Sequence, residues 1–360
     1  MTRARSRGTV SGGYRRFTLL ILVAATVAGG AILALTREPL PVKGRMEGAT
    51  QLSLLLDGPF GTRFAGEMIA HKREYFAPNV TVRADPNDPD FVAAVARQHA
   101  IGVTSGHKFL LAAWRGVPVT AFAASFLDTS IAIFTLESSG LRRPADLIGK
   151  RVGYRRATEG DVIFDAMMAQ LGLPRSQIAK VADRDSFDAL RAREVEAIIA
   201  PVDDQPSSSV TSGDVRLNVI KPQDYGIHVP GLVYFASNDL IHDQPSLITD
   251  VLQGLIRGWH FAYTDYARTV PILVGFDPER LDPDRVRLEL QQQRDLILPT
   301  GGRIADYDES RWRTLRDILI FAKLGEEQVP LAQLVNYQLL RDVYRRSPDL
   351  ATSGAGRGEN

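Results

Sequence analysis

The 360-residue sequence contains no cysteine. That absence excludes disulfides, thiolate metal sites, cysteine nucleophiles and lipid attachment at an N-terminal cysteine, but it fits either redox compartment. An excess of one charge sign is also lacking, because 43 basic residues stand against 42 acidic ones. A nucleic-acid surface needs a concentrated basic stripe, so nucleic acid is not an expected partner.

Motifs of catalysis are lacking as well. The sequence has no nucleophile elbow, glycine-rich phosphate loop or zinc-binding helix motif. Histidines occur at no spacing typical of metal ligands, and structural or surface roles are expected for His71, His99, His228, His242 and His260. We therefore predict no metal, no cofactor and no catalytic residue.

A basic head and an apolar run open the chain. Residues 1–16 carry five arginines and no acid, and an apolar segment follows at 17–36. This order is typical of an export signal whose basic end stays in the cytoplasm. At about 19 residues the run exceeds a usual signal-peptide core and nears the length of a bilayer span. The pattern favours an uncleaved membrane anchor over a cleaved signal peptide, with a tether at 37–50 and the remainder outside the cytoplasmic membrane.

From Gln51 onward, short apolar strands alternate with amphipathic helices. The first alternating unit begins with a strand at 52–56. A second begins with a strand that follows a short helical turn within 141–154, continues with a helix at 159–171 and ends near Ile220. Such alternation predicts an α/β fold with parallel sheets and crossover helices. Helices are predicted at 245–266, 282–293 and 309–324, and the Ser/Gly-rich residues 347–360 are expected to be disordered.

The stretch Ile101–Val119 has the geometry of a binding site. It predicts a strand at 101–103, a polar turn at Thr104–His107 and a helix at 108–115. Such a turn leaves unpaired backbone N–H groups at the positive end of the helix dipole, where a ligand's oxygens can meet them. The alternative is that Ser105 only caps the helix. Residues Asp57–Arg63 follow the first strand in the same way, at the edge where parallel sheets bind ligands.

Aromatic and basic side chains can be assigned to that edge. Phe60, Tyr154 and Tyr225 are candidates to stack on a planar ligand. Arg63 and Arg155 can hold an anion through paired N–H groups.

Acidic residues near the same turns would favour a ligand that donates hydrogen bonds over an anion. Asp57, Glu159 and Asp203 can accept hydrogen bonds from ring amines. For every single residue in these groups, a surface charge or a structural contact is the alternative, because pockets use few of the groups near them.

Five segments occur in one order that resembles a known family. They are AIGVTSGHKFLLAAWRGVPV, LRRPADLIGKRVGY, ALRAREVEAIIAP, DYGIHVPGLVYFASNDLI and VLQGLIRGWHFAYTD. The order resembles the solute-binding proteins of ABC importers over about residues 50–325. The subgroup that binds thiamine-precursor pyrimidines is the most similar, followed by the sulfonate, taurine and nitrate binders.

The resemblance implies a two-lobed periplasmic-binding-protein (type II) fold with a hinge of two crossover strands. Lobe 1 would comprise 50–133 and 235–346, and lobe 2 would comprise 137–232. The crossover strands would lie near Phe134–Leu136 and Tyr234–Ala236. A ligand would sit between the lobes and favour the closed form, because it contacts both lobes only there.

The resemblance also implies site residues, with departures. Asp57 matches the aspartate that ends the first strand in the pyrimidine binders, whereas Gly58 stands where they have tryptophan and Arg63-Phe64 replaces an Asn-His pair. These departures count against a pyrimidine ligand. The small-residue turn of the family corresponds to Ser105-Gly106, beside which His107 is unusual.

In the second lobe, Tyr154–Glu159 fits the strand-to-helix turn and Asp224–Gly226 fits the loop that closes over the ligand. The complete set of expected ligand-binding residues is Asp57, Gly58, Phe60, Thr62, Arg63, Thr104, Ser105, Gly106, His107, Tyr154, Arg155, Thr158, Glu159, Asp203 and Tyr225.

The expected function is that of the extracytoplasmic solute-binding component of an ABC importer, which would capture a small polar or heteroaromatic solute. Its partners would be the small-molecule ligand, the permease and ATPase subunits, and the membrane through residues 17–36; a monomer is expected. Two alternatives stay open. One is a membrane-tethered ligand-sensing domain. The other is an enzyme resembling the fungal thiamine-pyrimidine synthase, whose cysteines and histidine cluster have no counterpart here.

Overall fold

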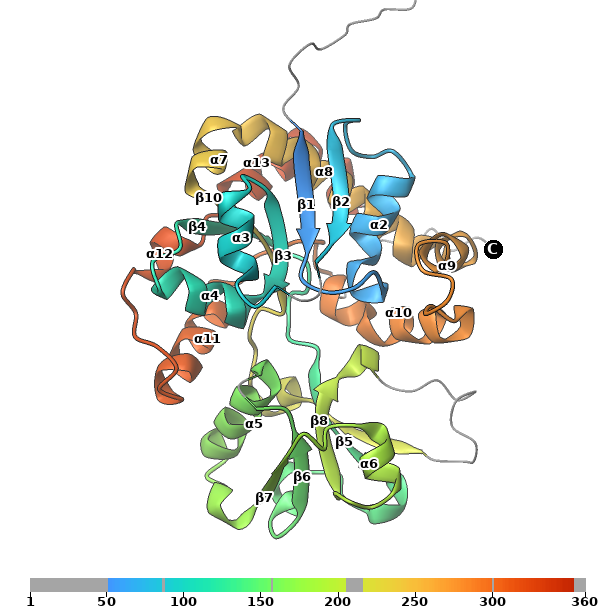
Figure 1. Cartoon of the computed structure of the whole chain (residues 1–360), viewed down its shortest axis with the longest axis vertical. Coiled ribbons are helices and arrows are strands. Elements are labelled where there is room, and N and C mark those ends of the chain that lie inside the picture. Colours follow the sequence, from blue (N-terminus) through green and yellow to red (C-terminus); the bar gives the residue numbers. More distant parts are fainter. Residues whose placement is uncertain (1–50, 86–87, 157, 205–215, 300, 353–360) are drawn as a thin grey trace, which may run out of the picture. The chain divides into compact units, whose positions relative to one another are not determined.

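The computed structural model describes residues 51–85, 88–156, 158–204, 216–299 and 301–352 (Figure 1). The expected membrane segment at 17–36 and the tether at 37–50 lie outside the described residues. None of the helices in the described part of the chain combines the length and the apolar character that a membrane span requires.

The first sheet is mixed, with strand order β2-β1-β3-β10-β4. Its strands are β1 (Leu52–Leu56), β2 (Val80–Ala84), β3 (Ile101–Ser105), β4 (Val119–Ala124) and β10 (Leu232–Ser237). Strand β1 runs parallel to β2 and β3, whereas β10 runs antiparallel to β3 and β4. The expectation of a parallel sheet is therefore confirmed for β1, β2 and β3 and wrong for β10. The physical reason is that β10 enters the sheet beside the carboxyl end of β3, where Leu232 pairs with Ser105, and must run back.

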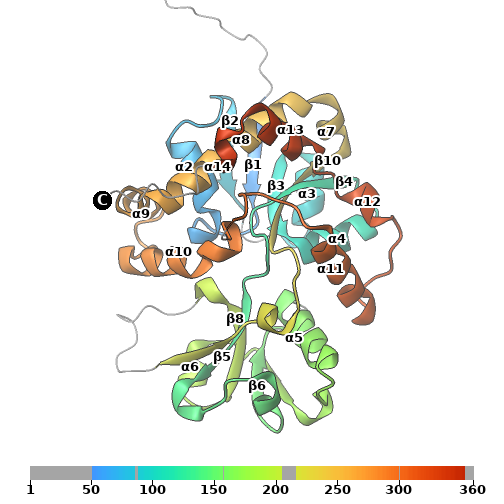
Figure 2. The same cartoon turned by 180° about the vertical axis from the view of Figure 1, so that it is seen from behind.

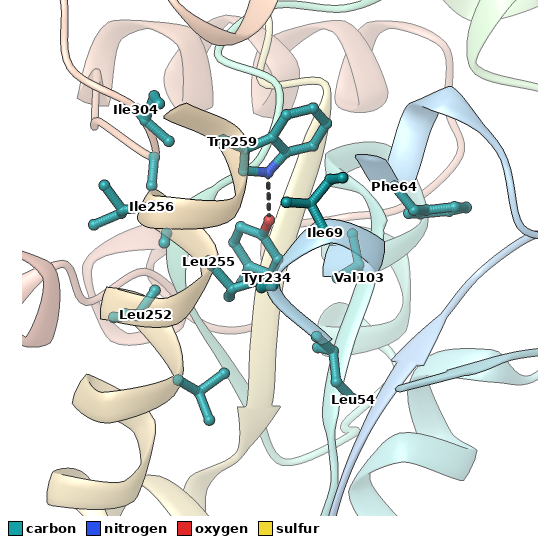
Figure 3. Close-up of a cluster of buried hydrophobic side chains, with 14 of the residues drawn as sticks. Leu54, Phe64, Ile69, Val103, Tyr234, Leu252, Leu255, Ile256, Trp259 and Ile304 are labelled. Carbon is teal, nitrogen blue, oxygen red and sulfur yellow. Dashed lines mark hydrogen bonds between the residues drawn. The ribbon is translucent and has the colours of Figure 1, made fainter. Parts of the chain in front are cut away.

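The alternating side chains of β1 explain how this sheet is buried on both faces. Leu52, Leu54 and Leu56 join one hydrophobic cluster, while Leu55 joins another. Helices α2 (Ala65–Lys72) and α8 (Pro245–Thr264) supply the first cluster, and α3 (Phe91–Arg97) and α4 (Gly106–Trp114) supply the second. Figure 3 shows part of the first cluster, with Ile69, Leu252 and Trp259 around β-strand residues Leu54 and Tyr234.

The second sheet is also mixed, with order β7-β6-β8-β5-β9. Its strands are β5 (Ile131–Leu136), β6 (Arg151–Tyr154), β7 (Ala179–Ala182), β8 (Ala197–Pro201) and β9 (Leu217–Ile220). Strand β6 is parallel to β7 and β8, and β5 is antiparallel to β8 and β9. Helices α5 (Glu159–Gln170) and α6 (Phe187–Arg191) belong to this part of the chain.

Two segments that belong to no strand connect the two sheets. Strand β4 ends at Ala124 in the first sheet and β5 begins at Ile131 in the second, so the first passage is residues 125–130. The return passage is residues 221–231, between β9 and β10. The segments expected to cross, Phe134–Leu136 and Tyr234–Ala236, each lie wholly within one sheet.

The chain then continues mainly as helices, several of which Figure 2 shows from behind. They are α7 (Asn238–Asp243), α9 (Tyr266–Val274), α10 (Pro283–Ile297), α11 (Glu309–Phe321), α12 (Leu331–Leu334), α13 (Gln338–Arg346) and α14 (Asp349–Thr352). The expectation of disorder is wrong for α14. Leu350 is 4 % exposed and its carbonyl oxygen lies 2.8 Å from His260 Nε2, so one apolar side chain and one hydrogen bond anchor this turn.

Candidate functional site

The junction of β3 and α4 differs from the expected polar turn. The strand continues through Ser105 and the helix begins at Gly106, so no separate turn stands between these two described elements. The Ser105 hydroxyl accepts a hydrogen bond from the Lys108 backbone N–H at 3.2 Å and therefore caps the helix. Ser105 nevertheless also lines a cavity, because the cap lies at the carboxyl edge of the sheet.

That cavity, which we call the Asp57 cavity, has a volume of about 330 Å³ and lies beside the carboxyl ends of β1 and β3 and the first turn of α5. Side chains from the first sheet, such as Asp57, meet side chains from the second, such as Ile199. The structure brings the following expected residues together in its lining: Asp57, Arg63, Ser105, His107, Arg155, Thr158 and Glu159. Sequence reasoning missed Lys108 and Asp185, which line it as well.

Asp57 is held by two donors. Lys108 Nζ lies 2.8 Å from Asp57 Oδ2 and 3.1 Å from Oδ1. The buried hydroxyl of Thr104 donates to the same carboxylate. Thr104 itself does not line the cavity, so its role in the structure is to orient Asp57. Lys108 could have been found from the sequence, because it follows the capping residue by one helical turn and so shares its side of the helix.

Glu159 is the first residue of α5, and its carboxylate accepts a hydrogen bond of 2.7 Å from Thr129 Oγ1. Burial raises the pKa of Glu159 to about 7, against the opposing effects of the Thr129 hydrogen bond and the charge of Arg63. The carboxyl group can therefore gain or lose a proton near neutral pH. It can accept a hydrogen bond in one state and donate one in the other.

His107 forms part of the wall as a neutral ring. The residue is 6 % exposed, and its Nε2 has no hydrogen-bond partner among the described residues. Burial, followed by the charge of Lys108, lowers the pKa of His107 to about 4. At neutral pH this side chain offers a ligand a neutral imidazole and no positive charge.

Each basic side chain of the Asp57 cavity faces an acid. Lys108 pairs with Asp57, Arg155 Nη2 lies 3.1 Å from Asp185 Oδ2, and Arg63 Nε lies 3.3 Å from an oxygen of Asp203. The Arg63 contact connects the two parts of the fold, because Arg63 follows β1 of the first sheet and Asp203 follows β8 of the second; Asp203 itself does not line the Asp57 cavity. The arrangement provides hydrogen-bond donors and acceptors side by side, with both charge signs represented.

A second cavity, which we call the Asp203 cavity, has a volume of about 360 Å³ and shares Arg63 with the first. It collects another group of the expected residues: Gly58, Phe60, Thr62, Arg63 and Asp203. Gly58 has φ +155°, a conformation that favours glycine. The ring of Phe60 contacts Phe276, with centroids 5.2 Å apart.

Three other expected residues line neither cavity. Gly106 is buried at the start of α4, where a Cβ would meet the Pro230 carbonyl oxygen at 3.0 Å. The Tyr154 ring is covered by Lys180, whose Nζ lies 4.4 Å from its centroid. Tyr225 packs against the second hydrophobic cluster, the one that contains Leu55 and to which α5 also contributes. The aromatic residues expected to stack on one ligand thus share no cavity, because Phe60 lines the Asp203 cavity and neither tyrosine lines either cavity.

A cluster next to the Asp57 cavity was not expected from the sequence. Asp128, in the first passage between the sheets, lies 2.7 Å from His228 Nδ1 in the second passage. Arg311 Nη1 of α11 donates to the same carboxylate at 2.8 Å. Burial raises the pKa of Asp128 despite these partners. In the described ranges, no group of three or more His, Asp or Glu side chains is placed to hold a metal ion.

Comparison with known proteins identifies a family that this chain matches. Residues 61–267 match the family described as NMT1/THI5 like. A Haemophilus influenzae protein provisionally named for thiamine biosynthesis is 25 % identical over 155 residues, which are 41 % of this chain and 49 % of that protein. The match thus spans about half the length of this relative.

Two solved structures illustrate the fold. The periplasmic aliphatic sulphonate binding protein SsuA from Escherichia coli has a TM-score of 0.66 and 16 % identity, with 81 % of this chain and 99 % of that chain covered. The desulfurization enzyme DSZB has a TM-score of 0.58 and 13 % identity, with 82 % and 99 % covered. At such identities the likeness concerns the fold alone. The family match covers more than half of the sequence and agrees with the resemblance in the sequence, and the chain belongs to the NMT1/THI5-like family.

Proposed function

We propose that this protein is an extracytoplasmic solute-binding protein that captures a small polar solute in the Asp57 cavity and delivers it to the permease of an ABC importer. The observation that carries the proposal is the lining of this cavity, to which both sheets contribute charged side chains at strand ends and at a helix N-terminus. The family supports it, and so does the fold shared with a sulphonate binding protein.

The lining narrows the class of solute. It has aliphatic side chains and paired charges, but no phenylalanine, tyrosine or tryptophan among its described residues. A flat ring would find no benzene or indole ring for stacking in that part of the structure. A solute that both donates and accepts hydrogen bonds fits the paired charges better than a thiamine-precursor pyrimidine does.

Capture would involve movement about the two passages between the sheets, residues 125–130 and 221–231. A solute that contacts Asp57 on one side and Glu159 on the other would favour the closed arrangement, because only there does it touch both. The lobe boundaries, this hinge and the anchor at 17–36 all belong to the proposal. An anchored chain would equally suit a ligand sensor, and neighbouring permease and ATPase genes would separate transport from sensing.

The test is a thermal-shift panel on the purified full-length chain. The panel contains sulfonates, nitrate, pyrimidines and small zwitterions, and one class is expected to raise the melting temperature. Glu159→Gln and Lys108→Met should reduce that rise, whereas the exposed control Glu137→Gln should keep it. Failure of every panel member to stabilise the protein would contradict the proposal.

A catalytic role is the second candidate. Glu159 has a pKa of about 7, which suits proton transfer at neutral pH, and one protein of the same fold is a desulfurization enzyme. Mass spectrometry of a stabilising solute after prolonged incubation separates the two roles. Recovery of the unchanged solute supports binding, and conversion that is lost in Glu159→Gln supports catalysis.

A further inference from the structure

The Asp203 cavity has features of a ligand site that the proposed function does not use. Its walls come from the loop 58–64 after β1, from Arg280 and Leu281 before α10, from α10 itself and from Asp203. Its volume lies within the range of about 300–1,000 Å³ that is usual for small-molecule pockets. It shares Arg63 with the Asp57 cavity.

Asp203 is a deeply buried charged group in this cavity. The residue is 4 % exposed, and one of its carboxylate oxygens faces Arg63 Nε at 3.3 Å. Its other oxygen, Oδ1, is buried and has no hydrogen-bond donor in the described part of the chain. A buried carboxylate oxygen without a donor is costly, so a ligand N–H group would stabilise it.

The neighbouring acid, Glu289, already has a hydrogen-bond donor at each of its carboxylate oxygens. Glu289 Oε2 accepts from Thr62 Oγ1 at 2.7 Å, and Glu289 Oε1 accepts from Arg285 Nε at 2.6 Å. Burial raises the pKa of Glu289, and the nearby Asp203 charge adds to this rise. A positive group at Asp203 Oδ1 would therefore also relieve the repulsion between the two acids.

A further buried acceptor lies behind these acids. Gln293 is fully buried; its Nε2 donates to the Thr62 carbonyl oxygen at 2.7 Å, and its Oε1 has no partner among the residues described. Gln293 does not line the cavity, so of these two acceptors only Asp203 Oδ1 bears on a ligand there.

Two arginines of the chain segment 280–285 also line the cavity. Arg280 and Arg285 line it with half-exposed side chains. The hydrogen bond from Arg285 to Glu289 uses Nε, and the guanidinium carries further N–H donors on its two Nη atoms. A guanidinium edge of this kind matches a carboxylate with two parallel hydrogen bonds.

We propose that the Asp203 cavity is a second ligand site, which takes a small zwitterion with its ammonium group at Asp203 Oδ1 and its carboxylate at Arg285. The acid comes from the chain segment after β8 and the arginine from α10. Binding at this site does not depend on the solute of the Asp57 cavity, so the two proposals can fail separately.

The test is calorimetric titration of the full-length chain with glycine, 3-aminopropanoate and 4-aminobutanoate, which differ in the distance between their charges. Butanoate and butylammonium serve as probes with one charge each. At least one zwitterion is expected to bind with a Kd on the order of 1 mM, and both one-charge probes should bind at least about tenfold more weakly.

Three variants locate the binding. Asp203→Asn and Arg285→Gln should each weaken it at least about tenfold, whereas the matched control Arg287→Gln, exposed on the same helix, should leave it unchanged. Arg285→Gln alters a half-exposed side chain and keeps the test valid if Asp203→Asn fails to fold. The proposal is overturned if no zwitterion binds, if a one-charge probe binds equally well, or if Arg285→Gln binds as the control does.

The variants of the other cavity separate this proposal from the proposed function. Loss of zwitterion binding in Lys108→Met or Glu159→Gln, with binding kept in Arg285→Gln, would place the ligand in the Asp57 cavity and overturn the second site. Zwitterion binding that depends on Asp203 and Arg285, together with a panel in which every stabilisation persists in Lys108→Met and Glu159→Gln, would support the second site and contradict only the proposed function.

Discussion

The hydroxyl of Thr129 donates a hydrogen bond of 2.7 Å to the carboxylate of Glu159. Thr129 lies in the first passage between the sheets, and its carbonyl oxygen accepts from Gln223 Nε2 at 2.7 Å. The preceding residue, Asp128, contacts His228 in the second passage. A wall residue of the Asp57 cavity is thus tied to both passages, so a ligand that displaces Glu159 would act directly on the segments that join the sheets.

Thr129→Val is expected to raise the pKa of Glu159 further above its ordinary value. The hydrogen bond from Thr129 favours the charged carboxylate, and valine keeps the branched shape without a donor. A further rise of about 0.5–1 unit is expected. Carboxyl-carbon NMR across pH measures it, and Glu159→Gln identifies the resonance. An unchanged midpoint would show that the hydrogen bond does not control the titration.

Lys108→Met is expected to alter binding far more than stability. The Lys108 side chain is 55 % exposed, so its ion pair with Asp57 is screened by water and should contribute less than about 1 kcal/mol. A solute that stabilises the protein should nevertheless bind about tenfold more weakly, because Lys108 supplies charge to the cavity wall. Urea unfolding and calorimetric titration measure the two effects. With Lys108→Arg as the control, a stability loss above about 2 kcal/mol would identify a structural lysine.

The alternation of strands and helices could be predicted from the sequence because each element carries a local signal. Strand β1 has the predicted bounds 52–56, and helix α5 ends one residue before the end of the predicted range 159–171. The direction of β10 carries no such signal. It depends on where the chain re-enters the first sheet. The chain returns from the second sheet beside the carboxyl end of β3, and nothing within residues 232–237 indicates this entry point.

Site residues could be placed at the correct strand ends, but their orientation and partners could not be predicted. Tyr154 does end β6, yet its ring is covered by Lys180 of β7. Lys180 pairs with Val152, which lies two residues before Tyr154 and so on the same face of the sheet. Arg63 and Asp203 are far apart in sequence and belong to different parts of the fold. Neither residue's local pattern indicates the other.

Gly258→Ala is expected to destabilise the protein by more than about 2 kcal/mol. Alanine in a helix interior is ordinarily favoured over glycine by up to about 1 kcal/mol, so the expected sign is opposite to that of helix propensity. A Cβ at position 258 in α8 would lie 2.1 Å from the carbonyl oxygen of Gly66 in α2, and backbone cannot move aside cheaply. Thermal unfolding measures the change. Gly61→Ala is the control, since a Cβ there has no contact closer than 3.9 Å among the described residues; equal melting temperatures for both variants would contradict the close helix contact.

Glu67 is fully buried beside the first hydrophobic cluster and makes stability depend on pH. Its Oε1 accepts from the Tyr234 hydroxyl at 2.8 Å, and the same hydroxyl accepts from Trp259 Nε1 at 3.0 Å, as the dashed line in Figure 3 marks. Its Oε2 has no hydrogen-bond partner among the described residues. Burial raises the pKa of Glu67 from 4.5 to about 7. The folded state therefore holds a proton that the unfolded state has already released between these two values.

The sign of the effect follows from that difference in bound protons. The free energy of unfolding falls as pH rises from about 4.5 to about 7, because only the folded state still binds the Glu67 proton in that range. Above about pH 7 both states have released the proton, and Glu67 no longer makes stability depend on pH. Glu67→Gln carries no charge at any pH. It should lie close to the wild type at pH 4.5 and exceed it by roughly 2–4 kcal/mol at pH 8.

Urea unfolding of both proteins at a series of pH values measures this difference, and the exposed substitution Glu137→Gln serves as the control for an ordinary carboxylate. If the stability curves of the wild type and Glu67→Gln ran parallel across pH, a protonated Glu67 would be contradicted. A Glu67→Gln protein less stable than the wild type at every pH would instead show that the buried amide fails to replace the carboxyl group beside Tyr234, and Tyr234→Phe would then share that loss because it removes the same hydrogen bond.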